Sequence, residues 1–250
     1  ELVRCDCRSR EFATLLTKVL PGAERAELFA MAGNIGSRST IRDTELSDFY
    51  EALDNNLAPA YAAARAFADA ASQAGVPGSI TFAGSVGAVR AHRYQAGYDA
   101  AKAAVESLAR SFALEYAPSG LATRVVQLGP IAQSATTRED GERASALVRL
   151  VPRGRYASVD ELAEAIVLFA GPAFDAATGA TLPLDGGLIQ QLRPVDIERP
   201  PTGAPAANPA DGGRTGIGRI DADHTRAANS TSDDTFGFVR PDASRGYFPC

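Results

Sequence analysis

Apolar residues recur along the first 190 positions in two alternating patterns. Short apolar runs, which are typical of buried strands, occupy residues 1–7, 26–32, 79–84, 123–128 and 180–184. Between them, apolar residues recur every three or four positions, which predicts amphipathic helices over residues 10–20, 44–73 and 98–116 and from residue 158 onward. This order of strand and helix predicts an α/β fold: a doubly wound, mostly parallel sheet of Rossmann-like type.

The predicted last helix has a recognisable start. The stretch Ser158-Val-Asp-Glu161 precedes Leu162, Ile166, Leu168 and Phe169. A serine followed three residues later by glutamate is typical of a capping box, in which each side chain satisfies a free backbone N–H group of the other residue.

The pattern ends near residue 192. Five prolines interrupt the next stretch, and Gly, Ser, Thr and Asp dominate beyond it. We therefore predict a Rossmann-like body over residues 1–192, a proline-rich linker over residues 193–210, and a tail over residues 211–250 whose structure the sequence specifies weakly.

Three polar residues follow or adjoin the third predicted strand. Ser85 comes directly after that strand, and Tyr98 and Lys102 lie four residues apart at the start of the next helix, so both face one side of it. Ligands of parallel sheets bind at the carboxyl ends of the strands. A nearby ammonium group lowers the pKa of a phenol from about 10, which predicts that Tyr98 acts as a general acid or base. The Ser85 hydroxyl would bind a carbonyl oxygen.

With these residues, the chain resembles the short-chain dehydrogenase/reductase family of the classical type. The resemblance covers residues 1 to about 190. It rests on the spacing of Ser85, Tyr98 and Lys102, on Asn56-Leu57, on Leu128-Gly129-Pro130-Ile131, and on the stretch from Thr178 to Gly187. It implies hydride transfer between a nicotinamide and a carbonyl or alcohol carbon.

The resemblance also implies roles for individual residues. Tyr98 would be the acid/base, Lys102 would lower its pKa and hold the nicotinamide ribose, Ser85 would orient the substrate oxygen, and Asn56 would anchor a water of the proton relay. The expected cofactor-binding residues are Tyr98 and Lys102 again, with Asp6 at the adenine, Gly33, and Gly129, Pro130 and Ile131 along the nicotinamide.

The chain departs from the family pattern at two places. The family has a first strand with a glycine-rich turn, whose amides hold the pyrophosphate, but this chain starts at what should be the third strand. In addition, Ala30-Met31-Ala32-Gly33 stands where the family usually has Asn-Asn-Ala-Gly.

The tail offers a substitute for the missing turn. Residues 211–218 match the glycine pattern, with Gly212, Arg214, Gly216 and Gly218 at its binding positions, and residues 236–242 read as the next strand. The chain is then either circularly permuted, with the weak strand 206–211 first, or truncated with an unstructured tail. If the turn is used, Arg214 and Arg240 favour NADP over NAD, while Asp242 favours NAD.

The composition of the chain limits the classes of molecule that it is expected to bind. The formal charge of −5 is spread without a basic block, which argues against nucleic acid and leaves a small ketone or alcohol as the expected substrate. No apolar run has the length of a membrane span and no signal peptide is recognisable, so the expected compartment is the cytoplasm. Three cysteines and two histidines lack metal-ligand spacing, so no metal site is expected and His92 and His224 are placed at the surface.

Other functions remain open at this point. A non-catalytic binding or scaffold protein would explain the missing glycine unit, but not why Ser85, Tyr98 and Lys102 occur together. Dehalogenase chemistry on this fold would require arginine at position 102. An enoyl reductase would require a longer spacing between tyrosine and lysine, with the tyrosine near position 95, which is Gln here.

The family also implies a homodimer or homotetramer formed through residues 44–73 and 98–116. Residues 132–156 are expected to form a substrate lid, with Leu147, Val148, Leu150 and Val151 on its apolar face.

Overall fold

The computed structural model describes residues 5–132, 146, 148–193 and 247–249. Its strands are β1 (Ala26–Ala30), β2 (Gly78–Ser85), β3 (Leu121–Leu128), β4 (Thr181–Leu184) and β5 (Tyr247–Pro249). Its α-helices are α1 (Arg10–Val19), α2 (Leu46–Asn56), α3 (Ala58–Ala74), α4 (Ala96–Tyr116) and α6 (Val159–Ala170). Short 3-10 turns are η1 (Val86–Ala88), η2 (Ala117–Ser119) and η3 (Pro172–Ala177).

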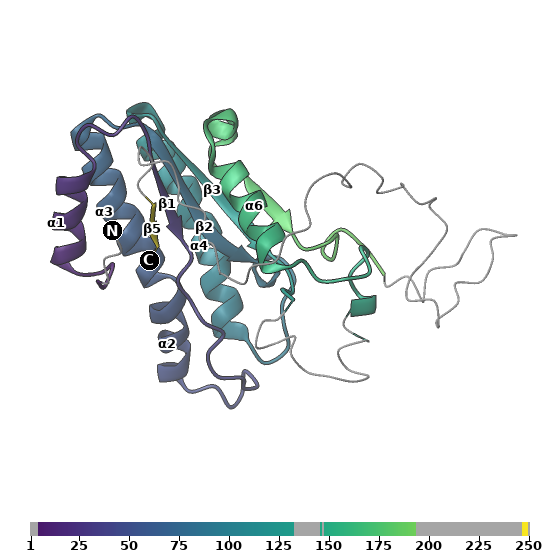
Figure 1. The fold of residues 1–250 in the computed structure, drawn as a ribbon. Helices are drawn as coiled ribbons and strands as arrows, with labels where there is room; N and C mark the ends of the chain where they lie inside the picture. Colours follow the sequence, from purple (N-terminus) through teal and green to yellow (C-terminus); the bar gives the residue numbers. More distant parts are fainter. Residues whose placement is uncertain (1–4, 133–145, 147, 194–246, 250) are drawn as a thin grey trace, which may run out of the picture.

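The five strands form one parallel sheet in the order β4-β3-β2-β1-β5 (Figure 1). Helices α3 and α4 pack on one face of this sheet and α6 on the other, so the predicted doubly wound α/β fold is confirmed. The register pairs Ser85 with Leu128 and Leu128 with Leu184. The carboxyl ends of β2, β3 and β4 therefore meet at one edge, where ligands of such sheets bind.

Strand β3 shows how the sequence separates the two faces. Val125 belongs to the apolar core formed with Phe67 of α3 and Phe112 of α4. The preceding residue, Arg124, instead donates to the carbonyl of Ala170 at the end of α6. Adjacent residues of a strand point to opposite faces. The face toward α6 thus contains a buried polar side chain at Arg124.

The single helix predicted over residues 44–73 is two helices. The first, α2, ends at Asn56, and α3 begins at Ala58 with Pro59 in its first turn. Proline has no N–H group to donate and its ring clashes with the preceding turn, so the helix breaks at this point. By contrast, the predicted capping box is confirmed, because the Ser158 hydroxyl accepts from the Glu161 N–H at 3.1 Å and Glu161 accepts from the Ser158 N–H at 3.0 Å.

The end of the first predicted strand needs correction, and a strand that the sequence did not predict lies beside β1. Residues 5 and 6 have no regular structure and residues 7 and 8 form a turn, while residues 1–4 lie outside the described part. In the Rossmann order the neighbour of the fourth strand is the first strand. Beside β1 that place is taken by β5, at the very end of the chain.

Several predictions fall on residues outside the described part. Gly212, Arg214, Gly216 and Gly218 lie there, as do the strand candidates 206–211 and 236–242, the linker at residues 194–210, and His224. Within the described ranges, no helix is long and apolar enough to cross a membrane. Among the same residues, no group of three or more His, Cys, Asp and Glu side chains is placed to hold a metal ion.

Candidate active site

The site begins where strand β2 ends. Ser85 is the last residue of β2 and is 5% exposed, and its hydroxyl accepts a hydrogen bond from the Gly87 N–H at 3.1 Å. This bond fixes the turn that leads out of the sheet. Tyr98 and Lys102 lie in the first two turns of α4, which packs along β2 and β3. The structure therefore brings Ser85, Tyr98 and Lys102 to the same edge, as the sequence predicts.

The Tyr98 phenol is half-buried. Burial raises its pKa above the ordinary value, the interaction with the Ser85 hydroxyl lowers it, and the charge of Asp99 raises it further. The net direction is upward, so the expected lowering of the Tyr98 pKa by Lys102 is wrong for this arrangement. The reason is geometric: the Lys102 ammonium lies over the phenol ring, 5.8 Å from its centroid, and desolvation of the phenol dominates.

Lys102 is a buried cation. It is 5% exposed, and its Nζ donates to the Ala83 carbonyl at 3.0 Å. Burial lowers its pKa from 10.5 to about 8. An ammonium group has three N–H donors, and within the described residues only this one hydrogen bond from Nζ is formed. Two donors are therefore available for a ligand at the carboxyl edge of the sheet.

The depressed pKa of Lys102 predicts that its charge costs stability. Unfolded chain holds this proton up to about pH 10.5 but folded chain releases it near pH 8, so stability rises with pH between these values and the full cost applies below pH 8. The difference corresponds to about 3 kcal/mol. We expect Lys102→Met to raise the free energy of unfolding at pH 7 by about 1–3 kcal/mol in urea denaturation, after the lost hydrogen bond is deducted.

The chain offers a matched control for this prediction. Its only other lysine, Lys18, is exposed at the end of α1, and Lys18→Met should leave the free energy of unfolding nearly unchanged. The gain from Lys102→Met should also shrink as the pH approaches 10. A loss of stability at pH 7 would contradict the burial argument.

Asn56 and Gly33 lie beside Lys102. The Asn56 side chain is 1% exposed, accepts from the Asn34 N–H at 3.1 Å, and donates to the carbonyls of Asn34 at 2.8 Å and Ala52 at 2.9 Å. Both of its amide hydrogens are thus engaged, so they do not anchor the expected water. A Cβ at Gly33 would lie 2.5 Å from Asn56 Oδ1 and 3.3 Å from Lys102 Nζ. A side chain at position 33 would therefore clash with Asn56 and crowd the Lys102 ammonium, and glycine avoids this.

Residues 129–131 follow β3, where the nicotinamide was expected. A Cβ at Gly129 would lie 2.6 Å from the Cα of Asp185, so only glycine allows β3 and β4 to end so close together. Pro130 is half-buried, and Ile131 forms a parallel bridge with Ala157. Asp185 is 6% exposed and accepts from the N–H groups of Gly187 and Ile189, both at 2.8 Å. It therefore shapes the segment that follows β4.

Asp6, expected at the adenine, lies at the surface in the turn before α1. Its carboxylate accepts from the Arg8 N–H at 2.9 Å and from the Arg8 guanidinium at 3.4 Å. The hydrogen bond from the Arg8 backbone is the main cause that lowers the pKa of Asp6. The carboxylate is thus already bound within its own turn, and it can meet a cofactor only through its remaining acceptor positions.

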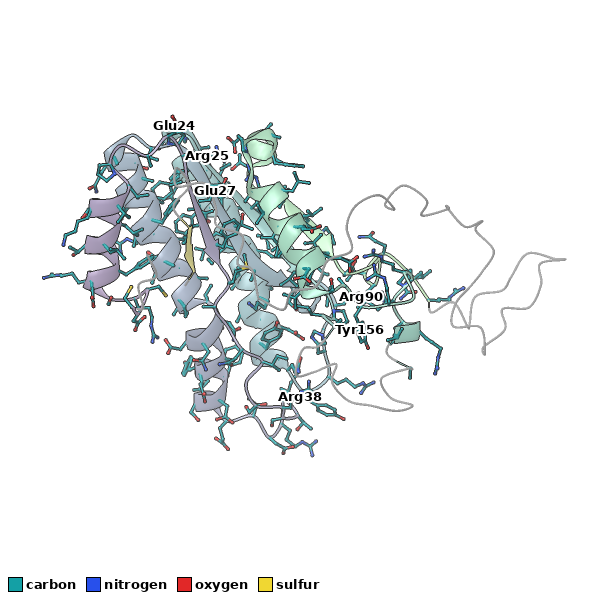
Figure 2. All side chains as sticks on the ribbon, in the orientation of Figure 1. Glu24, Arg25, Glu27, Arg38, Arg90 and Tyr156 are labelled. Carbon is teal, nitrogen blue, oxygen red and sulfur yellow. The ribbon has the colours of Figure 1, made fainter. Side chains whose placement is uncertain are left out.

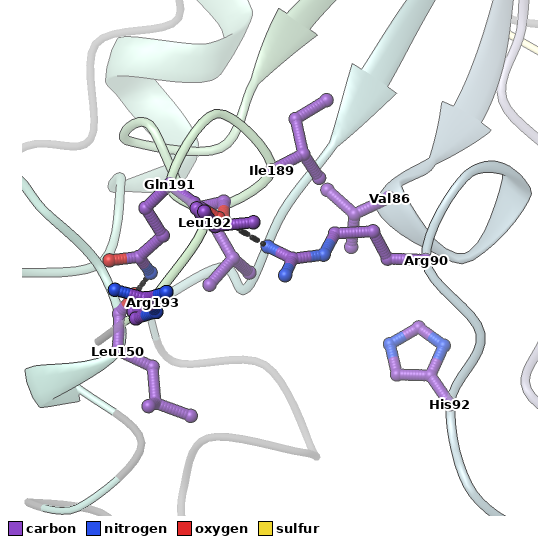
Figure 3. Close-up of a pocket in the computed structure, with 9 residues that line it drawn as sticks. Val86, Arg90, His92, Leu150, Ile189, Gln191, Leu192 and Arg193 are labelled. Atoms are coloured by element: carbon purple, nitrogen blue, oxygen red, sulfur yellow. Dashed lines mark hydrogen bonds between the residues drawn. The ribbon is translucent and has the colours of Figure 1, made fainter. Parts of the chain in front are cut away.

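A pocket of about 230 Å³ adjoins these residues (Figure 3). Val86, Arg90 and His92 line one wall, and the other wall comes from residues 188, 189 and 191–193 together with Leu150. Of the predicted lid, Leu150 lines this pocket, but Val151 is 3% exposed and packs against Gly186. Leu147 and residues 133–145 lie outside the described part.

Sequence reasoning placed His92 at the surface without a role, and this is incomplete. The His92 ring is part of the pocket wall, 6.5 Å from the Tyr98 ring between centroids. Asp99 accepts from the His92 N–H at 2.7 Å and contacts the ring Nδ1 at 2.8 Å. The one available signal was an acidic residue directly after Tyr98, in the first turn of a helix.

The described residues fit one half of a nicotinamide cofactor. Lys102 has donors for ribose hydroxyls, Gly33 leaves room beside it, and the Tyr98 hydroxyl lies at the same edge. The half that would hold the pyrophosphate has no counterpart in the described ranges, since the predicted glycine turn lies outside them.

Comparisons with known proteins agree with this geometry. Residues 3–189 match the family described as enoyl-(acyl carrier protein) reductase. The chain is 30% identical over 194 residues to the uncharacterized short-chain type dehydrogenase/reductase y4vI of Sinorhizobium fredii, which covers 74% of this chain and 34% of that protein. It is 27% identical over 163 residues to an acetoacetyl-CoA reductase of Allochromatium vinosum, covering 65% of this chain and 66% of that one.

Solved structures are similar as well. A putative NAD(P)-dependent gluconate 5-dehydrogenase of Beutenbergia cavernae, crystallised with NADP at low occupancy, superimposes with a TM-score of 0.68 at 29% identity. The match covers 76% of this chain and 77% of that one. An oxidoreductase of the short chain dehydrogenase/reductase family from Burkholderia thailandensis gives a TM-score of 0.65 at 32% identity, covering 76% and 73%. The chain spans less than two thirds of the length of each of the two curated relatives named above.

Proposed function

The chain belongs to the short-chain dehydrogenase/reductase family, and we propose that it is an oxidoreductase that transfers a hydride between NAD(P) and the carbonyl or alcohol carbon of a small molecule. One observation carries the proposal: Ser85, Tyr98 and Lys102, from two different elements, meet at the carboxyl edge of the sheet. A purely structural role gives no reason to bury an ammonium group below a phenol there.

In this reaction the nicotinamide supplies or accepts the hydride, and the protein handles the proton. The Tyr98 pKa is raised by burial, so its phenol carries a proton at neutral pH and can donate it to a carbonyl oxygen during reduction. The Lys102 ammonium lies over the ring of the phenolate that remains, and its charge would offset part of the cost of burying that phenolate, although burial sets the net direction of the Tyr98 pKa. In oxidation the same groups act in reverse order.

Ser85 and Lys102 then position the reactants. The Ser85 hydroxyl keeps a donor for the substrate oxygen because its bond to the Gly87 N–H uses it as an acceptor. Lys102 would hold the ribose through its two remaining donors. Asn56 would act through its neighbours, by fixing the loop at Asn34 next to Gly33.

The spacing of Tyr98 and Lys102 and the names of the relatives support the proposed reaction type. The matching family is described as an enoyl reductase, yet the relatives that match include an acetoacetyl-CoA reductase and several 3-oxoacyl-[acyl-carrier-protein] reductases. Tyr98 and Lys102 are four positions apart, with three residues between them, as in the carbonyl-reducing members, and we propose reduction or oxidation at a C–O bond. We propose NADP as the cofactor, on the arginines of the tail and on the NADP of two similar structures.

We also propose a homo-oligomer built on the helices predicted for it. Large apolar side chains are exposed on these helices: Tyr50 of α2 by 58%, Tyr61 of α3 by 45% and Leu114 of α4 by 81%. Burial of such side chains against a second copy of the chain would be favourable.

Titration with NADPH and NADH tests the proposal. We expect nicotinamide fluorescence to change saturably on addition of the full chain. Lys102→Met should weaken binding about 10- to 100-fold, because charge-assisted hydrogen bonds to the ribose are lost. Lys18→Met, the exposed control, should bind as the unmodified chain does. If neither cofactor binds, the oxidoreductase assignment is wrong, however well Tyr98 and Lys102 are placed.

A further inference from the structure

The pocket beside Tyr98 has walls of unequal chemistry. Most of its lining is aliphatic: Val86, Leu150, Leu188, Ile189 and Leu192. Its polar side chains are Arg90, His92, Gln191 and Arg193, and no acidic side chain is among the described residues that line it. An apolar cavity with a few converging polar groups is the usual form of a small-molecule site. The charged side chains among these lining residues, Arg90 and Arg193, are both positive.

Arg90 is held in place without being neutralised. Its Nη1 donates to the carbonyls of Leu188 at 2.8 Å and Gln191 at 3.3 Å, so the side chain reaches from one wall to the other (Figure 3). These partners are neutral carbonyls, and Arg90 has no carboxylate partner within the described ranges. The nearby Arg153 and Arg155 differ, since both are paired with Glu161.

Arg193 adds a second cation to the opposite wall. Like Arg90, it forms no ion pair with any residue that the structure describes, and it is among the residues that line the pocket (Figure 3). A guanidinium presents a planar set of N–H donors that matches the two oxygens of a carboxylate. Two such groups at one aliphatic pocket favour an anionic ligand over a neutral one.

The third polar group of the pocket, His92, is held in its orientation by Asp99. Asp99 is 7% exposed and uses both oxygens on His92, one on the backbone N–H and one on Nδ1. A Cβ at Gly87 would lie 2.1 Å from Asp99 Oδ1, so the pair exists only because position 87 is glycine. Both oxygens of Asp99 are thereby directed at His92, and Asp99 is not among the residues that line the pocket.

We propose that this pocket selects a substrate with a free carboxylate on a short aliphatic chain. Arg90 and Arg193 bind the carboxylate, the leucines and isoleucine cover the chain, and His92 borders the reacting carbon at Tyr98. The inference rests on the proposed function and names its substrate class. A volume of 230 Å³ lies below the roughly 300–1,000 Å³ of pockets for drug-sized ligands, which suits an acid of a few carbons.

Binding of hexanoate and hexanamide to the full chain separates charge from chain length. We expect titration calorimetry to show hexanoate binding about 10- to 100-fold more tightly, the size of one or two charge-assisted hydrogen bonds. Arg90→Met should abolish this preference and Arg193→Met should reduce it. Arg110→Met, at an exposed position of α4 away from the pocket, is the matched control and should keep it. Equal binding of the two ligands, or a preference that survives in Arg90→Met, overturns the inference.

Two further measurements keep the proposals apart. Oxidation of 3-hydroxyhexanoate with NADP should exceed that of its methyl ester by the same factor of about 10 to 100 in kcat/KM. Butyl phosphate that binds as tightly as hexanoate would reassign the pocket to phosphate monoesters and overturn the carboxylate assignment. Failure of the nicotinamide titration sinks the oxidoreductase function, whereas failure of the hexanoate test with intact cofactor binding sinks only the substrate class.

Discussion

Tyr98→Phe is expected to lower kcat by about 10²- to 10⁴-fold, the usual contribution of a general acid or base. The phenylalanine ring keeps the packing of the tyrosine, including the Lys102 ammonium at 5.8 Å and the His92 ring at 6.5 Å. Only the hydroxyl that we propose as the proton donor is lost. Steady-state rates with NADPH would show the fall in kcat, while the dissociation constant of NADPH should change little.

A second tyrosine provides the matched control. Tyr94 lies four residues earlier, is 55% exposed, and has a left-handed backbone with φ of 69°. Tyr94→Phe removes a hydroxyl at the same small structural cost, and kcat should stay within about twofold of the unmodified chain. If Tyr98→Phe kept more than a tenth of the activity, Tyr98 would not be the acid or base.

The fold was predictable because its signals are local. The spacing of apolar residues over 79–84 and 98–116 reports strand and helix directly, and a parallel sheet brings the ends of β2, β3 and β4 together without further information. The position of Ser85, Tyr98 and Lys102 at one edge follows from these two facts. The break at Pro59 was also present in the sequence, but the continuous apolar spacing across it outweighed the proline.

Features that depend on burial were not predictable. The Tyr98 pKa is set first by how much water the fold removes from the phenol, and the residues that remove it are distant in sequence. The direction was therefore wrong although the neighbouring Lys102 was recognised. The pairing of β5 with β1 also joins residues that are distant in sequence, and no local pattern predicts it.

The contact between His92 and Asp99 depends on an irregular turn. Six residues separate the two, and the turn at residues 93 and 94, where Tyr94 has a left-handed backbone, brings them within 2.8 Å. Gly87 is the residue that permits it. A glycine in such a stretch predicts a turn, but its sequence does not say which side chains the turn brings together.

The buried polar cluster on the α6 face of the sheet lies at the end opposite to the site. Figure 2 shows Arg25 and Glu27 at the top of the molecule, well separated from Arg90. The Arg124 side chain is 0% exposed and donates to Asp175 at 2.7 Å and to the carbonyls of Ala170 and Phe174, both at 3.0 Å. Asp175 also accepts from Arg25, at 2.9 Å and 3.0 Å. Asp175 is thus the counter-ion of Arg124, whose guanidinium is not exposed to water.

Asp175→Ala is expected to lower the free energy of unfolding by about 2–3 kcal/mol, because it leaves the buried charge of Arg124 without its counter-ion, while the 42% exposure of the Asp175 side chain keeps the cost below that of a fully buried pair. Domains of this kind are stable by only about 5–15 kcal/mol, so the loss is large. Urea denaturation at pH 7 would measure it. Since the cluster is remote from Arg90 and Tyr98, cofactor affinity below the unfolding transition should be unchanged.

The double variant decides whether the unpaired charge is the cause. Arg124→Met combined with Asp175→Ala removes the guanidinium as well, and an apolar side chain of similar length is compatible with the contact that Arg124 makes with the Phe169 ring at 5.6 Å. The double variant should therefore be more stable than Asp175→Ala alone, as when buried ion pairs are replaced by apolar residues. Glu164→Ala, an exposed position on α6, should cost little. If the two losses simply added, Asp175 would stabilise the protein through some contact other than Arg124.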